Sequence, residues 1–88
     1  MTPETPSLFS AVICMRENTL YIDITRDVNG KPFMRITESG SAQGRHYRSV
    51  VRIFGTEPMS QFLSFVNEAG TLMMAELKSR KEVSQKAP

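Results

Sequence analysis

Aromatic and basic residues recur at alternate positions along this 88-residue sequence, and together they have a defined chemistry. Tyr21, Phe33 and Arg35 belong to two alternating segments, and Arg48 and Arg52 to a third. Unpaired nucleic-acid bases stack on aromatic rings, while arginine meets phosphates and stacks its planar guanidinium on bases. These residue types on one surface favour binding of single-stranded nucleic acid.

The residues that most often perform catalysis are sparse. The sequence has one histidine, His46, and one cysteine, Cys14, and neither has a nucleophile, an orienting carboxylate or further metal ligands placed beside it by the sequence. The glycines within 39–44 match neither GxGxxG nor GxxxxGK, the patterns of phosphate-binding loops. We therefore expect no enzyme, no catalytic residue, no metal site and no cofactor.

Composition indicates one small intracellular domain. An apolar share of 40 % suffices for a core, and a lone cysteine favours a reducing compartment. No apolar run approaches the roughly 18 to 20 residues that cross a bilayer, and no basic segment precedes an apolar one at the N-terminus. We expect a cytoplasmic protein, nucleoid-associated if bacterial, with no membrane partner.

Hydropathy patterns predict an α+β fold, a four-stranded antiparallel meander followed by one C-terminal helix. The predicted strands cover 8–15, 19–25, 33–38 and 45–54. Asn29-Gly30 predicts a tight hairpin, and 39–44 is typical of a flexible loop. Thr56-Glu57-Pro58 predicts a helix start, and Gly70 a kink or an end. The predicted organisation is a lead-in at 1–7, a domain at 8–78 and a charged flexible tail at 79–88.

This register predicts two different sheet faces. The helix is expected to pack on the apolar face, which carries Leu20, Ile22, Ile24, Met34, Ile36, Val51 and Ile53. The open face then carries Thr19, Tyr21, Asp23, Phe33, Arg35, Thr37, Arg48, Val50 and Arg52. Residues 16–52 hold seven basic against four acidic side chains, in a chain of net charge +2. Tyr21 and Phe33 could instead be cross-strand partners or lie in a subunit contact, and Asp23 and Glu38 count against nucleic acid.

The order of elements and several segments resemble a single repeat of the PUR family, the purine-rich-element-binding proteins. The resemblance covers about residues 8–70. The matching segments are Asn18-Thr19-Leu20-Tyr21-Ile22-Asp23-Ile24, Asn29-Gly30-Lys31-Pro32-Phe33-Met34-Arg35-Ile36-Thr37-Glu38, Arg48-Ser49-Val50-Val51-Arg52-Ile53 and Met59-x-x-Phe62-Leu63-x-x-Val66. It implies binding of single-stranded DNA or RNA with a preference for G-rich sequence. It also implies an intertwined homodimer, since two repeats make one PUR domain. The whirly-like single-stranded DNA binders share this order.

Carried over by position, the resemblance implies nucleic-acid-binding roles for Arg16, Asn18, Tyr21, Lys31, Phe33, Arg35, Arg48 and Arg52. The first hairpin departs from the family, since Glu17-Asn18-Thr19 stands where a short basic pair is usual. We expect a non-enzymatic DNA- or RNA-binding protein, with a role in transcription or another nucleic-acid process. The alternative is a protein-interaction or assembly domain that docks through the open sheet face.

Overall fold

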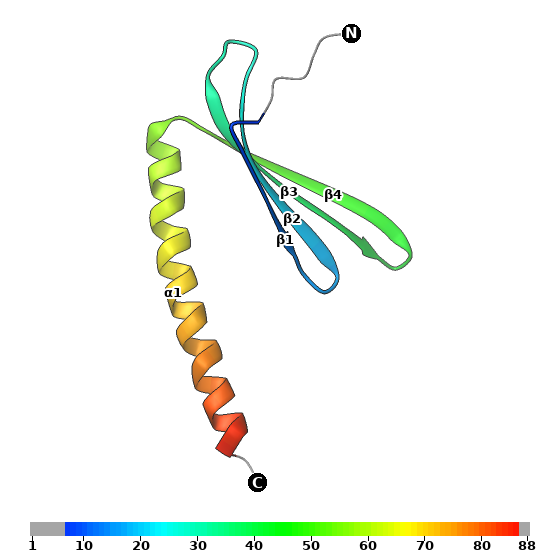
Figure 1. Cartoon of the computed structure of the whole chain (residues 1–88), viewed down its shortest axis with the longest axis vertical. Coiled ribbons are helices and arrows are strands. Elements are labelled where there is room, and N and C mark those ends of the chain that lie inside the picture. Colours follow the sequence, from blue (N-terminus) through cyan, green and yellow to red (C-terminus); the bar gives the residue numbers. More distant parts are fainter. Residues whose placement is uncertain (1–6, 87–88) are drawn as a thin grey trace. The chain divides into compact units, whose positions relative to one another are not determined.

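The described part of the chain has four strands and one helix, in the order that the sequence predicts. The computed structural model describes the backbone of residues 7–86 and the side chains of residues 7–80. The elements are β1 (Phe9–Cys14), β2 (Asn18–Arg26), β3 (Pro32–Ala42), β4 (Arg45–Phe54) and α1 (Thr56–Lys86) (Figure 1). The α+β prediction is therefore confirmed. The part of the chain up to Gly55 and the part from Thr56 form two separate units, so the sheet and the helix are each described by themselves.

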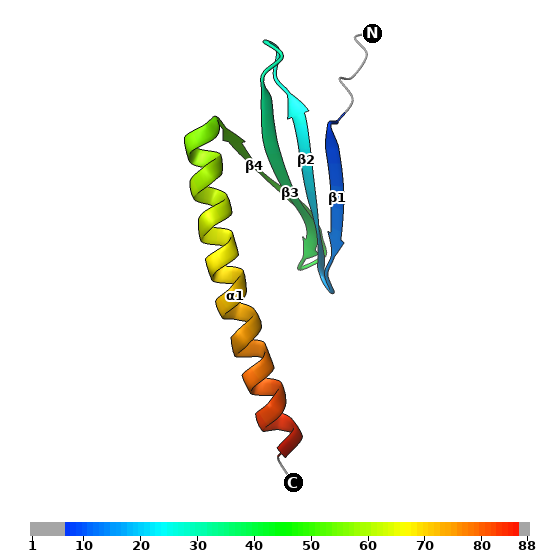
Figure 2. The same cartoon turned by 60° about the vertical axis from the view of Figure 1, so that its left-hand side comes forward.

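The sheet is an open antiparallel meander whose spatial order, β1-β2-β3-β4, follows the sequence (Figure 2). The β2–β3 hairpin closes through Asp27, whose carboxylate Oδ1 accepts from the backbone N–H groups of Asn29 at 2.8 Å and Lys31 at 2.9 Å. Of the predicted Asn29-Gly30 pair, only Gly30 has a positive φ, of 81°. The predicted hairpin is confirmed, and the Asp27 side chain rather than Asn29 supplies the second stabilising feature of the turn.

The predicted flexible loop over 39–44 is wrong. Strand β3 continues to Ala42 and pairs with β4 as far as the Ala42–Arg45 partners, which leaves a two-residue turn. Gln43 and Gly44 occupy this turn with φ of 55° and 76°, the left-handed conformation that a two-residue hairpin requires. Residues 39–44 are small or polar and show no apolar alternation, so the sequence did not predict a strand there. The two-residue turn nevertheless brings the two strands together and allows them to pair.

The register places apolar and polar residues on opposite faces of the sheet, as predicted. One cross-strand row on the first face is Phe9, Ile24, Met34 and Ile53, and the next is Ala11, Ile22, Ile36 and Val51. The predicted apolar face is confirmed. Because β1 joins the sheet, this face also gains Phe9, Ala11 and Ile13, which the prediction did not assign.

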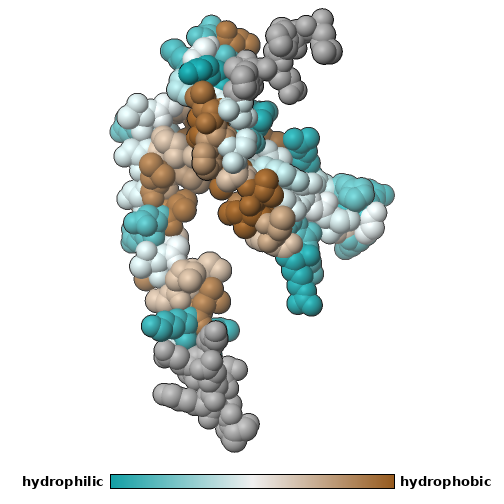
Figure 3. Space-filling view, viewed as in Figure 1, coloured by the Kyte–Doolittle hydropathy of each residue, from teal (hydrophilic) through white to brown (hydrophobic). Residues whose placement is uncertain are grey.

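Apolar side chains remain exposed on both units. No apolar residue is buried among the residues whose side chains the structure describes. On the sheet Phe9, Ile13 and Val51 are about half exposed, and on the helix so are Val66 and Leu77. Figure 3 shows hydrophobic residues, in brown, at the surface of both units. The predicted packing of the helix on the apolar face stays a prediction.

Helix α1 is longer than expected and continuous. It begins at Thr56, directly after Gly55, whose φ of 91° ends β4. It runs through Gly70, where we expected a kink or an end, and includes residues 79–86, which we expected in a tail. Residues 1–6 of the predicted lead-in at 1–7, and the final residues 87–88, lie outside the described residues. No helix in the described part of the chain is long and apolar enough to span a membrane.

Candidate nucleic-acid interface

Four cross-strand rows of the open face carry the candidate site, and the strand register decides their content. A fifth row, Ser41 and His46, lies beyond them. The first row is Thr25, Phe33 and Phe54; the second is Ser10, Asp23, Arg35 and Arg52; the third is Val12, Tyr21, Thr37 and Val50; the fourth is Cys14, Thr19, Ser39 and Arg48. Residues two apart along a strand lie on the same face about 6.6 Å apart. Aromatic groups therefore alternate with cationic ones along the face.

The second row contains the open face's ion pair. Arg35 Nη2 lies 3.6 Å from Asp23 Oδ2, with the side chains 38 % and 18 % exposed. Ser10 Oγ donates to the other oxygen of the same carboxylate, Asp23 Oδ1, at 2.7 Å. Asp23 is thus held from both sides by neighbours in its own row, and Arg52 stands opposite Arg35 in the register.

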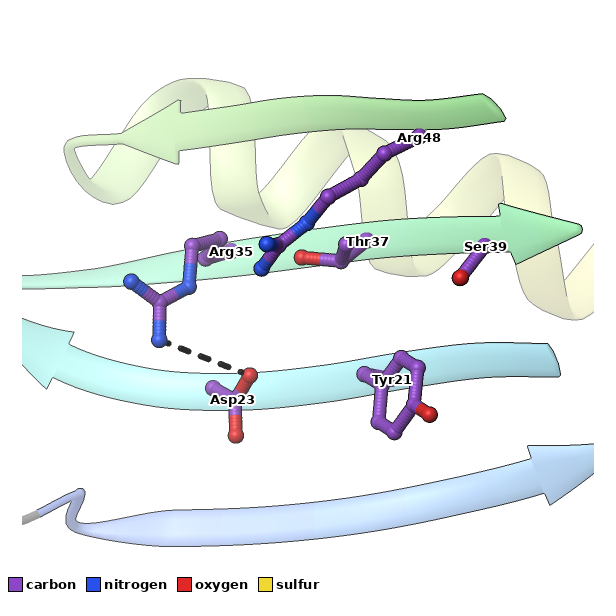
Figure 4. Close-up of a pocket in the computed structure, with 6 residues that line it drawn as sticks. All are labelled: Tyr21, Asp23, Arg35, Thr37, Ser39 and Arg48. Carbon is purple, nitrogen blue, oxygen red and sulfur yellow. Dashed lines mark ion pairs between the residues drawn. The ribbon is translucent and has the colours of Figure 1, made fainter. Parts of the chain in front are cut away.

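A hollow of about 310 Å³ opens between the second and fourth rows. Its lining residues are Tyr21, Asp23, Arg35, Thr37, Ser39 and Arg48 (Figure 4). Figure 4 shows the Arg48 side chain extending from β4 over β3, while Tyr21 stands on β2. Thr37 forms the floor and is only 3 % exposed. The hollow thus offers an aromatic ring, two guanidinium groups, one carboxylate and small hydroxyls.

Phe33 does not stand alone on the first row. Its ring stacks on that of Phe54, with centroids 4.7 Å apart and an angle of 22° between the planes. Phe33 is therefore a cross-strand partner, the alternative that the sequence left open, while the Phe54 side of the pair is half exposed. The pair presents one combined apolar platform to solvent. The sequence analysis did not identify Phe54 as a site residue.

The structure gathers five of the eight predicted site residues on the open face and separates the other three. The five are Tyr21, Phe33, Arg35, Arg48 and Arg52. Arg16 lies in the β1–β2 turn and Lys31 in the β2–β3 turn, at opposite ends of the sheet (Figure 2). Asn18 lies on the apolar face, where its Nδ2 donates to Glu38 Oε2 at 2.6 Å. Asn18 and Leu20 are two positions apart in the same strand, so the two side chains share a face.

Ser10 and Ser39 are site residues that the sequence did not reveal. Ser10 lies in a strand whose apolar run hid its alternation, and Ser39 lies in the segment interpreted as a loop. Their signal could only come from the strand pairing, which sets Ser10 opposite Asp23 and Ser39 opposite Arg48.

A second polar cluster closes one end of the apolar face. Tyr47 Oη donates to Glu38 Oε2 at 3.2 Å, the same oxygen that Asn18 meets. The Tyr47 ring covers Gly40, where an added Cβ would lie 2.6 Å from Tyr47 Oη. Desolvation, followed by the hydrogen bond to Glu38 and its negative charge, raises the pKa of Tyr47 above its ordinary value of 10.0. This cluster limits how far an apolar partner can extend along the face.

No group of three or more histidine, cysteine, aspartate or glutamate side chains that could hold a metal ion occurs among the residues described. The open face offers rings for stacking, guanidinium groups for phosphates, and a carboxylate and hydroxyls for hydrogen bonds.

No model of a known protein family matches this chain. No curated protein is significantly similar to it in sequence.

Proposed function

We propose that this chain binds single-stranded DNA or RNA through the open face of its sheet, without enzymatic activity, as a PUR-like protein. The observation that carries the proposal is the order of the rows on one face. The Phe33–Phe54 platform comes first, the arginine row (Arg35 and Arg52) second, and the row of Tyr21 third. The proposed location is the cytoplasm, and the proposed process is transcription or another use of single strands. A preference for G-rich sequence follows from the resemblance alone.

The electrostatics of this face support the same ligand. Within the part of the chain that the structure describes, Arg48 and Arg52 form no ion pair, so both charges are available to phosphates. A duplex keeps its bases inside, so it could use the arginines but not the rings. Both kinds of contact together therefore favour a single strand.

A homodimer is part of the proposal, because a chain of this size whose described residues include no buried apolar side chain has little to stabilise it. The helix supports it further. At 3.6 residues per turn, the apolar positions between Met59 and Leu77 cover an arc of about 200°, interrupted only by Gly70 and Glu76. A helix that covers one sheet face needs an apolar stripe of about 100° or more. The flank at Phe65 and Leu72 is then left for a second contact, such as the partner's helix.

One observation favours the alternative, a domain that docks another protein. The Asp23–Arg35 pair removes part of the positive charge of the open face, which suits a mixed protein surface better than a phosphate chain. A protein partner would use the same rings and the same arginines.

Titration of labelled 12-nucleotide single strands, measured by fluorescence anisotropy at several salt concentrations, tests the nucleic-acid proposal. If Arg35, Arg48 and Arg52 each neutralise one phosphate, the log–log salt slope should be about −2 per site. A matched duplex should bind more weakly. Equal affinity for duplex and single strand, or no binding at low salt, would overturn the proposal and leave the docking domain.

Sedimentation equilibrium tests the dimer. The expected mass is twice the 9.9 kDa of one chain. Leu72→Glu places a charge on the flank of the apolar arc and should weaken association, whereas Thr71→Glu, on the polar side of the helix, should not. A wild-type chain that is folded and monomeric would contradict this part of the proposal.

A further inference from the structure

The open face carries one carboxylate at its centre, and the contacts of that carboxylate are unusual for a surface acid. Asp23 is mostly covered, with 18 % of its side chain exposed, and both of its oxygens have partners. Ser10 Oγ holds Oδ1 at 2.7 Å, while Arg35 lies 3.6 Å from Oδ2. The carboxylate is therefore fixed in position at the edge of the hollow, beside Tyr21.

A fixed negative charge opposes the binding of phosphates in two ways. It attracts the guanidinium of Arg35, and it repels any phosphate placed over the second row. Arg52, opposite Arg35 in the same row, lies within this influence, and Arg48, although attached two rows away, reaches into the same hollow. A surface selected only for positive charge would not keep an acid here.

A base and a phosphate meet this carboxylate differently. A base stacked on Tyr21 lies over the hollow and can turn its edge toward Asp23, and base edges carry N–H donors that a carboxylate accepts. A phosphate in the same place has only acceptors and a negative charge. The same side chain can therefore satisfy one group and reject the other.

We propose that Asp23 determines specificity for strands that carry bases. Its carboxylate accepts hydrogen bonds from a base in the hollow, and it repels phosphate groups from Arg35 and Arg52 when no base is present. This inference rests on the proposed function. Ser10 acts as a positioning residue, because its hydroxyl fixes the carboxylate that meets the base. The preference for a strand with bases over an abasic strand thus comes from the negative charge of Asp23 as much as from the aromatic rings.

The test compares two probes, a mixed-sequence 12-nucleotide DNA strand and an abasic strand with the same number of phosphates. Asp23→Asn keeps the shape of the side chain and removes its charge. Asp23→Thr is the second variant, because positions 19 and 25 of the same face already carry threonine. Glu17→Gln, in the exposed β1–β2 turn, removes the same charge away from the hollow and is the matched control.

Asp23→Asn should raise the affinity for the abasic strand by about two- to fivefold, the worth of a partly exposed ion pair. Affinity for the strand with bases should stay unchanged or fall, so the ratio of the two affinities decreases. Glu17→Gln should shift both probes alike. If both Asp23 variants also shift the two probes equally, the inference is overturned while the proposed function stands. If the wild-type chain binds neither probe, or both equally, the proposed function and the inference fail together.

Discussion

The two tyrosines of this chain provide a controlled test of base stacking. Tyr21 is 39 % exposed and Tyr47 is 38 % exposed, but Tyr21 lies on the open face and Tyr47 on the opposite one. Replacing either by leucine removes an aromatic ring while keeping an apolar side chain in the strand. The two variants differ in the face that loses its ring, and Tyr47→Leu also removes the hydrogen bond to Glu38.

Tyr21→Leu should weaken single-strand binding by about 1–3 kcal/mol, the worth of one stacked base, which corresponds to about 5- to 150-fold in Kd. One base is the appropriate number, because Tyr21 is the aromatic residue that lines the hollow. Tyr47→Leu should leave the affinity within about twofold of the wild type, on the same principle.

Fluorescence anisotropy with the same labelled strand measures both variants. The salt slope should be unchanged in Tyr21→Leu, because a neutral ring neutralises no phosphate. Equal losses in the two variants would indicate general destabilisation of the sheet. No loss in Tyr21→Leu would refute stacking at this position and would leave its ring a role in packing or protein contact.

Three further predictions concern charge, titration and packing. Arg48→Gln should reduce the magnitude of the log–log salt slope by about 0.7, as one phosphate contact is lost, and an unchanged slope would remove Arg48 from the site. The phenol of Tyr47 should titrate above pH 10 by ultraviolet absorbance, and Glu38→Gln should lower that pKa. Because the raised pKa favours the neutral phenol in the folded state, its contribution to stability is present below pH 10 and is lost as the pH rises through the folded pKa. Gly40→Ala should destabilise the fold by about 1 kcal/mol in a denaturant melt, because the new Cβ would lie 2.6 Å from Tyr47 Oη and the Tyr47 side chain must turn away from its hydrogen bond with Glu38. Gly70→Ala, in a helix with nothing within 4 Å, should instead stabilise it by up to about 1 kcal/mol, and the opposite ranking would contradict the packing argument.

The strands were predictable where the hydropathy alternation is strong. Leu20, Ile22 and Ile24 alternate with polar residues, so a strand with one apolar face was the only pattern that suited them. The end of β3 was not predictable in this way, because Ser39-Gly40-Ser41-Ala42 has no apolar side chain large enough to mark a face. The pairing of this segment depends on the two-residue turn, Gln43-Gly44, that directly follows it, and on the Tyr47 ring that covers Gly40.

The residues of the candidate site were also predictable only where the hydropathy alternation is strong. Alternation alone assigned Tyr21, Arg35 and Arg52 to one face, because side-chain direction in a strand has a period of two. Asn18 escaped this rule because the predicted strand began at residue 19. It was assigned by resemblance, whereas β2 includes it and places it on the other face with Glu38.

By itself, the sequence determined the element order, the helix start and the division of the sheet into an apolar and a polar face, because each depends on residues close together in the chain. Only the tertiary structure decided which residues of different strands meet: Phe33 with Phe54, and Asp23 with Arg35 and Ser10. Those pairs depend on the register between strands, which hydrogen bonding and turn length set across separations of up to 21 residues.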